Sequence, residues 1–128
     1  MNSLELEKLL DELRALPHET EWVEFKQDRN EPQQIGEYIS ALSNSACLHG
    51  KEAGYLVFGI EDGTHAVKGT SFEPDKEKIG NQEIENWLAT QLSPRIDFEI
   101  ISFTYQASPI VLIKTDPTYN TPVSFKGE

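Results

Sequence analysis

The stretch ETEWVEFKQ near the N-terminus is the densest group of chemically active side chains in this sequence, with carboxylates at Glu19, Glu21 and Glu24. A second acidic pair, Glu61 and Asp62, lies in the segment GIEDG. Converging carboxylates form a hard-oxygen site that suits Mg²⁺ or Mn²⁺, and such an ion activates water and stabilises charge on a phosphoryl group. The spacing also fits a simpler interpretation, in which Glu21 is an ordinary strand-edge charge and Asp62 a hairpin-turn residue.

Several lysines and two aromatic residues could contact a phosphate backbone and its bases. The candidates are Lys26, Lys51, Lys68 and Lys126 for phosphate, with Trp22 and Tyr38 as stacking surfaces. The alternative is that each lysine is a scattered solubilising charge and that Trp22 belongs to the core.

Composition restricts the class of protein. The chain has 128 residues, is 38% hydrophobic and carries a net charge of -11, so we expect one domain with one core. A protein that binds phosphates usually has a basic footprint, which this chain lacks as a whole, so a nucleic-acid role would depend on a local patch or a bridging metal. Cys47 is the only cysteine, and no apolar run is long enough to cross a bilayer. We therefore expect a cytoplasmic protein without a membrane partner.

Familiar catalytic signatures are absent from the sequence. There is no GxxxxGK[ST] phosphate loop, which argues against ATP as a cofactor, and there is no GxGxxG, HExxH or GxSxG motif. The histidines, His18, His49 and His65, fall in different loops or element ends, and we expect them to be solvent-facing polar residues.

Hydrophobic periodicity predicts three helices. The first is capped by Ser3 and ends by Pro17; the second starts at Pro32 with an apolar stripe at Ile35, Ile39, Leu42 and Ala46; the third is capped by Asn81 and stops before Pro94.

Strands are predicted at residues 22–26, 55–60, 97–105 and 109–115, with a return strand at 64–69 after the Asp-Gly turn. The expected order is α-β-α-β-β-α-β-β, an α+β domain with helices packed on a mixed, mostly antiparallel sheet. Alternation places Trp22, Glu24 and Lys26 on one strand face. If strands 22–26 and 55–60 are neighbours, the two acidic groups converge at one edge of the sheet.

These segments resemble the Schlafen AlbA-type domain, which in bacterial proteins is also called a divergent AAA or RecG-related helicase domain. The resemblance covers roughly residues 17–128. It includes, in family order, the E-x-x-x-x-E-F-K opening, ALSN, GYLVFGI, D-G-T-H-x-V-x-G-T, NQEIENWL and LSPRIDFE.

The resemblance implies a DNA- or RNA-binding domain at the N-terminus of a longer bacterial protein, such as a transcriptional regulator. Family members continue from a segment like TPVSFKGE into a further strand, so we expect residues 1–128 to be an N-terminal fragment. Some vertebrate relatives cleave RNA with a metal site whose residues match Glu19, Glu24 and Asp62 here. Those relatives have two lobes, and a homodimer of this chain could substitute for the second.

Three hypotheses follow. The first is a nucleic-acid-binding module with Lys26, Lys51 and Lys68 near the contact surface. The second is a divalent-metal-dependent endoribonuclease with Glu19, Glu24 and Asp62 as ligands and Lys26 steadying phosphate charge. The third is an interaction or oligomerisation domain that does not touch nucleic acid.

Overall fold

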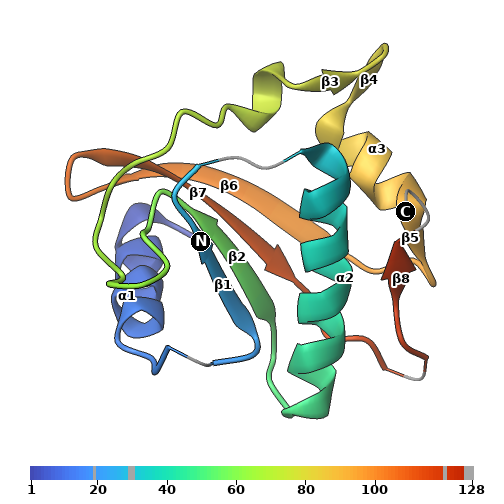
Figure 1. The fold of residues 1–128 in the computed structure, drawn as a ribbon, viewed down its shortest axis with the longest axis horizontal. Helices are drawn as coiled ribbons and strands as arrows, with labels where there is room; N and C mark the ends of the chain where they lie inside the picture. The colour runs from blue at the N-terminus through green and yellow to red at the C-terminus, as the bar shows by residue number, and fades with distance from the viewer. Residues whose placement is uncertain (19, 29–30, 120, 126–128) are drawn as a thin grey trace.

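A four-stranded mixed sheet forms the centre of the computed structural model, which describes residues 1–18, 20–28, 31–119 and 121–125 (Figure 1). The strand order is β1-β2-β7-β6, and β1 pairs parallel with β2 while the other two pairs are antiparallel. The strands are β1 (Val23–Lys26), β2 (Gly54–Phe58), β6 (Phe98–Tyr105) and β7 (Ser108–Thr115). The two edges of this sheet are therefore β1 and β6.

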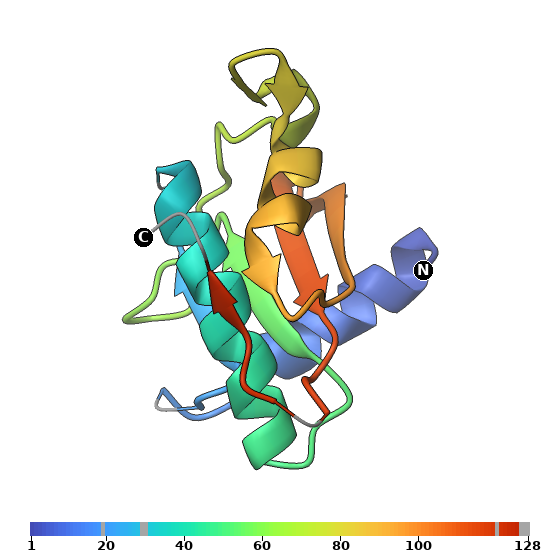
Figure 2. The same ribbon diagram turned by 90° about the vertical axis from the view of Figure 1, so that its right-hand side faces the viewer.

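Helices cover both faces of the sheet (Figures 1 and 2). On one face, α2 (Pro32–Leu48) and α3 (Ile84–Gln91) pack on Leu56, Phe58 and Val111. On the other, α1 (Ser3–Arg14) packs on a cluster that includes Val57 and Leu112. The continuous apolar run of β2 is thus explained, since both faces of this strand are covered.

Short elements complete the chain between and after the main strands. A 3₁₀ turn precedes a small hairpin, and two further short strands pair near α3; they are η1 (Pro74–Lys76), β3 (Lys78–Ile79), β4 (Gln82–Glu83), β5 (Leu92–Ser93) and β8 (Ser124–Phe125). In the part of the chain that is described, no helix has the length and apolar character needed to cross a membrane.

The C-terminal segment is fastened across α2 by polar side chains of that helix. Asn44 makes two hydrogen bonds with the backbone of Val123, donating to its carbonyl at 3.0 Å and accepting from its amide at 2.8 Å. The hydroxyl of Ser43, which is fully buried, donates to the carbonyl of Asp116 at 2.7 Å. These contacts explain why polar residues occupy the ALSN turn of an otherwise amphipathic helix.

The predicted fold class is confirmed, and the predicted elements occur in the expected order. The stripe of α2 is buried as expected, at Ile35, Ile39, Leu42 and Ala46. The connection between β6 and β7 is a two-residue turn, with φ of 49° at Gln106 and 63° at Ala107.

The return strand expected at 64–69 is reduced to one bridge between Ile60 and Val67. Strand β2 cannot accept it, because β1 already occupies one of its edges and β7 the other. A hairpin signal in the local sequence is therefore overridden by strands that come from farther along the chain.

Both predicted helix caps are displaced. Asn2, and not Ser3, caps α1 in a capping box, since its side chain accepts from the amide of Glu5 and the Glu5 side chain accepts from the amide of Asn2. Glu83, and not Asn81, precedes α3. Asn81 follows Gly80, whose φ of 65° makes the turn of the β3–β4 hairpin.

Candidate functional site

The parallel pairing of β1 with β2 brings the two acidic groups of the sequence together. Asp62 follows the carboxyl end of β2, and Glu24 lies on the adjacent β1. Both residues line one cavity of about 200 Å³, together with Thr20 and His65. The convergence expected from the sequence is therefore present for Glu24 and Asp62, and we call this cavity the carboxylate pocket.

Glu24 has an unusual electrostatic environment. Burial raises the pKa of its carboxyl above the ordinary value, Lys26 lowers it, and the charge of Asp62 raises it again. The Lys26 ammonium lies 3.7 Å from the Glu24 carboxylate, as two residues with the same orientation on one strand should. Glu24 and Asp62 are thus close enough to repel, with Lys26 as the nearby compensating cation.

Lys26 is held against α2. Its Nζ lies 4.9 Å from the centre of the Tyr38 ring. A hydrogen bond with Tyr38 raises the pKa of Lys26, burial opposes this, and the charges of Glu24 and Asp62 raise it further. The cation is therefore fixed beside an aromatic ring and two carboxylates.

A second cation–aromatic pair lies at the other end of β1. Lys51 Nζ stands 4.4 Å from the ring centre of Trp22, the residue before the strand. His49 also contacts the Trp22 ring, and its Nε2 lies 2.7 Å from a Glu21 carboxylate oxygen. Trp22 is half-buried against the α1-side cluster, so it does not share the environment of Glu24 and Lys26 as alternation predicted.

Lys68, the third predicted phosphate contact, lies beyond the carboxyl end of β1. Its amide donates to Gly59, whose own amide donates to the Lys26 carbonyl at 2.8 Å. Its ammonium is 4.0 Å from Glu61. The structure therefore brings Lys68 near the end of the strand but pairs it with a carboxylate of the corner, while Lys126 lies outside the described residues.

The corner that carries Asp62 is closed by its own hydrogen bonds. The His65 amide donates to the Glu61 carbonyl at 2.8 Å, and the Glu61 amide donates to Ala66 at 2.9 Å. The hydroxyl of Thr64 donates to the Glu61 carboxylate at 2.8 Å. Asp62 is thus an exposed carboxylate on a turn whose backbone is well connected.

His65 is a site residue that the sequence interpretation missed. It was expected to face solvent, yet it is 8% exposed and its ring packs on Phe25, with centroids 4.5 Å apart. The His65 ring also lies beside the ring of His18, another residue of the pocket wall, with centroids 5.0 Å apart. The D-G-T-H-x-V-x-G-T segment of the family resemblance contains His65, but no hydrophobic period marks it as buried, because its burial depends on α1 and β1, which are distant in the sequence.

A complete set of metal ligands is not formed by the described residues. Glu19, the first predicted ligand, lies outside them, and among the rest no three histidine, cysteine or carboxylate side chains are grouped to hold an ion. Glu24 and Asp62 supply hard oxygen donors of the kind that Mg²⁺ and Mn²⁺ prefer. Two of the three predicted ligands therefore lie together in one cavity, and the ion itself stays a prediction.

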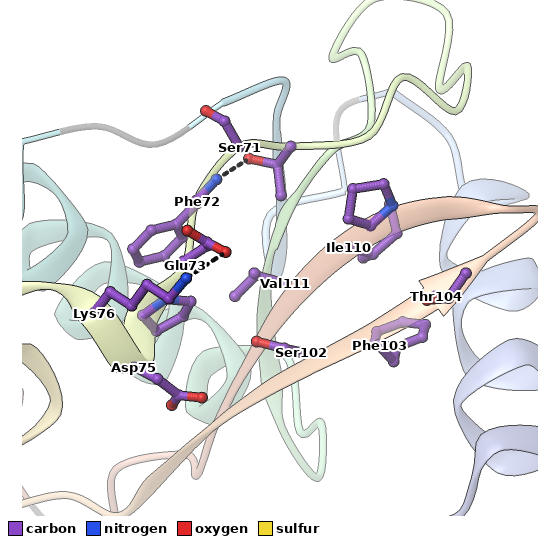
Figure 3. A pocket seen from close by; sticks show the side chains of 13 residues that line it. Ser71, Phe72, Glu73, Asp75, Lys76, Ser102, Phe103, Thr104, Ile110 and Val111 are labelled. Atoms are coloured by element: carbon purple, nitrogen blue, oxygen red, sulfur yellow. Dashed lines mark hydrogen bonds and ion pairs between the residues drawn. The ribbon is translucent and has the colours of Figure 1, made fainter.

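A larger cavity of about 620 Å³ lies away from these residues (Figure 3). It is bounded by residues 70–76 and by the β6–β7 hairpin, and its wall includes an exposed Lys76–Glu73 ion pair at 3.4 Å. Among the described residues, none of those predicted for the site lines this cavity.

Comparison with known proteins gives a family and two similar folds. The family model described as Schlafen, AlbA_2 matches residues 19–128. The solution NMR structure of the N-terminal domain of a RecG-related protein from Nitrosomonas europaea has 21% identity and a TM-score of 0.61, and the match covers 98% of this chain and 82% of that one. The DIP2311 protein from Corynebacterium diphtheriae has 16% identity and a TM-score of 0.52; the match covers 97% of this chain but only 24% of that one. No curated protein matches the chain by sequence. At these identities the two structures show a shared fold.

Proposed function

The chain belongs to the Schlafen, AlbA_2 family, and on that premise we propose that it is a nucleic-acid-binding domain that contacts single-stranded DNA or RNA along the β1 edge. The observation that carries the proposal is the pair of cation–aromatic contacts at the two ends of this strand, Lys51 over Trp22 and Lys26 over Tyr38. Single-strand binding proteins combine cations for the backbone with aromatic surfaces for the bases.

The two pairs lie toward opposite faces of the sheet, with Trp22 against the α1-side cluster and Tyr38 against the α2-side cluster, so a strand of nucleic acid would cross the β1 edge to touch both. Trp22 and Lys26 are four residues apart, which is roughly 13 Å along a β-strand. All four side chains of the pairs are partly or fully exposed, so a ligand can reach them. The net charge of -11 opposes the approach of a polyanion, so we expect modest affinity that falls steeply as salt increases.

Fluorescence anisotropy with labelled single-stranded DNA and RNA oligonucleotides tests the proposal. The double variant Lys26→Gln/Lys51→Gln should bind about tenfold more weakly, and each lost phosphate contact should lower the slope of log K against log salt by about one. The control Lys114→Gln removes one charge beside β6 and should leave affinity and slope unchanged.

Two outcomes would contradict the proposal. Absence of binding to both oligonucleotides at low salt would favour an interaction or oligomerisation domain. A loss of log affinity in the Lys114→Gln control that is half of the loss in the double variant would mean that only net charge matters, since the control removes one charge and the double variant two, and that the β1 edge is not the contact surface.

The resemblance also places such domains in longer proteins, and the similar N. europaea domain comes from a protein named for its relation to the DNA helicase RecG. We extend the proposal to that setting: the domain would bring the remainder of a transcriptional regulator or RecG-related protein to nucleic acid. Comparing the affinity of residues 1–128 with that of the full gene product tests this extension.

Metal-dependent RNA cleavage is a second candidate, favoured by the proximity of Glu24 and Asp62 in the carboxylate pocket. These two residues, with Glu19, would hold Mg²⁺ or Mn²⁺, and the ion would activate water and stabilise phosphate charge. Lys26 would orient the phosphate beside them. Calorimetric titration with Mn²⁺ should show binding that Glu24→Gln abolishes, and a structured RNA should be cut only without EDTA. Binding of Mn²⁺ that survives Glu24→Gln would rule out this site.

A further inference from the structure

The last turn of α1 is joined to the Asp62 corner by two reciprocal hydrogen bonds. The Arg14 Nε donates to the His65 carbonyl at 2.8 Å, and the His65 Nδ1 lies 2.9 Å from the Arg14 carbonyl. Because a carbonyl only accepts, Nδ1 must carry the proton. Each residue thus uses both its side chain and its backbone carbonyl to hold the other, and we call this pair of bonds the Arg14–His65 latch.

Arg14 is itself held by a buried residue, Tyr105. Its Nη1 donates to the Tyr105 hydroxyl at 2.9 Å, and its guanidinium lies 5.6 Å from the centre of the Tyr105 ring. The Tyr105 hydroxyl in turn donates to Asp11, one turn earlier in α1. Tyr105 is 2% exposed at the end of β6, so the guanidinium is aimed at His65 by a buried partner.

Because His65 is part of the turn that carries Asp62, holding His65 in place also restrains this turn. Its φ of 59° is uncommon for a residue other than glycine and needs stabilisation from its surroundings. Its amide closes the turn on Glu61, and Asp62 lies inside that turn. Holding His65 at its backbone carbonyl and at its ring therefore fixes the far end of the segment that carries the Asp62 carboxylate.

Helix α1 lies before residues 19–128, the range that the family model matches. The chain that follows it, through Leu16 and His18, also forms one wall of the carboxylate pocket. The residues that hold the corner thus come from a helix outside the matched range, while the carboxylates come from within it.

We propose that Arg14 and His65 are positioning residues, which hold the Asp62 corner against the carboxylate pocket by tying it to a helix that precedes the residues matched by the family model. This inference rests on the proposed function only in treating that pocket as part of the site. The latch itself is a claim about structure and dynamics, so it can be tested without nucleic acid or metal.

Native-state amide hydrogen exchange measured by NMR is the test, with the amides of Glu61 and His65 as reporters and those of Val57 and Leu112 as references for global stability. Arg14→Lys keeps the charge but cannot reproduce the two-nitrogen fork that contacts His65 and Tyr105. We expect it to accelerate exchange of the reporters at least tenfold more than exchange of the references. The ¹³C signal of the Asp62 carboxylate at fixed pH should shift as well.

Substitutions at His65 separate the latch from general packing. His65→Ala should behave like Arg14→Lys, whereas His65→Asn should retain slow exchange and the wild-type Asp62 signal. Asparagine tolerates positive φ and keeps an N–H that can donate to the Arg14 carbonyl.

Three results would overturn the proposal. Reporter amides that keep wild-type protection in Arg14→Lys would show that the corner does not need the latch. Equal acceleration of reporters and references would show that α1 only stabilises the whole fold. Fast exchange of the reporter amides in His65→Asn would show that the hydrogen bond to the Arg14 carbonyl is not the cause of their protection.

The proposed function fails by a different result. Absence of oligonucleotide binding by the wild-type chain would refute it and would leave these exchange measurements unaffected.

Discussion

The two edges of the main sheet, β1 and β6, carry different chemistry. Strand β1 presents the charged residues Glu24 and Lys26, which lie beside Tyr38 and the Asp62 corner. Strand β6 is twice as long, and its single charged residue, Glu99, stands opposite Lys114 in the register with β7. Charged side chains therefore make up half of β1 but only one residue in eight of β6.

The apolar residues of β6 serve both cores. Phe98 and Ile100 pack on the cluster beneath α2 and α3, while Ile101 and Phe103 pack on the cluster beneath α1. Side chains at this edge therefore contribute to stability.

At the β1 edge, burial opposes the ionised form of Glu24, so a carboxylate is kept there at some cost to stability. Such a conflict between local chemistry and stability is typical of a functional site.

Truncating the β6 edge should have the largest effect on stability. Phe103→Ala removes a half-buried ring from the α1-side cluster, and we expect the free energy of unfolding to fall by about 1–3 kcal/mol, less than for a fully buried phenylalanine. Urea denaturation measures this change. Thr104→Ala, at an exposed position on the same strand, should change stability by less than about 0.5 kcal/mol.

Phe103→Ala also tests whether the β6 edge takes part in oligonucleotide binding. Oligonucleotide affinity of Phe103→Ala should equal that of the wild type under conditions where both are folded. A loss of affinity comparable to that of Lys26→Gln/Lys51→Gln would mean that the two edges do not have separate roles.

The fold was largely predictable because each main element has its own period. The stripe of α2 and the alternation of Val23 and Phe25 in β1 follow from burial on one side, and both sets are buried. The proximity of the GIEDG corner to β1 was expected only if the two strands were neighbours, and the parallel pairing places them so.

Apart from the two helix caps, the features that the sequence did not predict depend on contacts between distant residues. The Asn44 side chain bonds to Val123, 79 positions away, and the latch joins residues 51 positions apart. Local propensity carries no information about such partners, so the burial of His65 could not be read from its neighbours. The return strand failed for a related reason, since β1 and β7 occupy both edges of β2.

Removing the charge of Glu24 should raise the free energy of unfolding at pH 7, whereas Phe103→Ala should lower it. The folded-state pKa of Glu24 is raised, so the stability this group contributes is present at low pH and is lost as pH rises through that pKa. Glu24→Gln should therefore stabilise the protein at pH 7 by less than about 1 kcal/mol, and the gain should vanish below about pH 4, where the carboxyl is protonated in both states. Urea denaturation at the two pH values measures it.

The Lys26–Glu24 ion pair is the interaction that could make Glu24→Gln destabilising instead. Lys26 lowers the pKa of Glu24 and loses its partner in the variant. Destabilisation at pH 7 would show that this ion pair outweighs the cost of burying the carboxylate, and the β1 edge would then resemble β6 in supporting the fold.

The smallest effects on stability and on oligonucleotide affinity are expected for a substitution of Lys68, which lies just beyond the carboxyl end of β1. Its ammonium is half-exposed and lies at the limit of ion-pair distance from Glu61, so the pair should add well under 1 kcal/mol to stability. Because Glu61 offsets its charge, Lys68→Gln should weaken oligonucleotide binding less than threefold, against about tenfold for Lys26→Gln/Lys51→Gln. Anisotropy titrations at one salt concentration distinguish these values. A tenfold loss would extend the contact surface from β1 onto the corner, and Glu61→Gln would then be expected to strengthen binding.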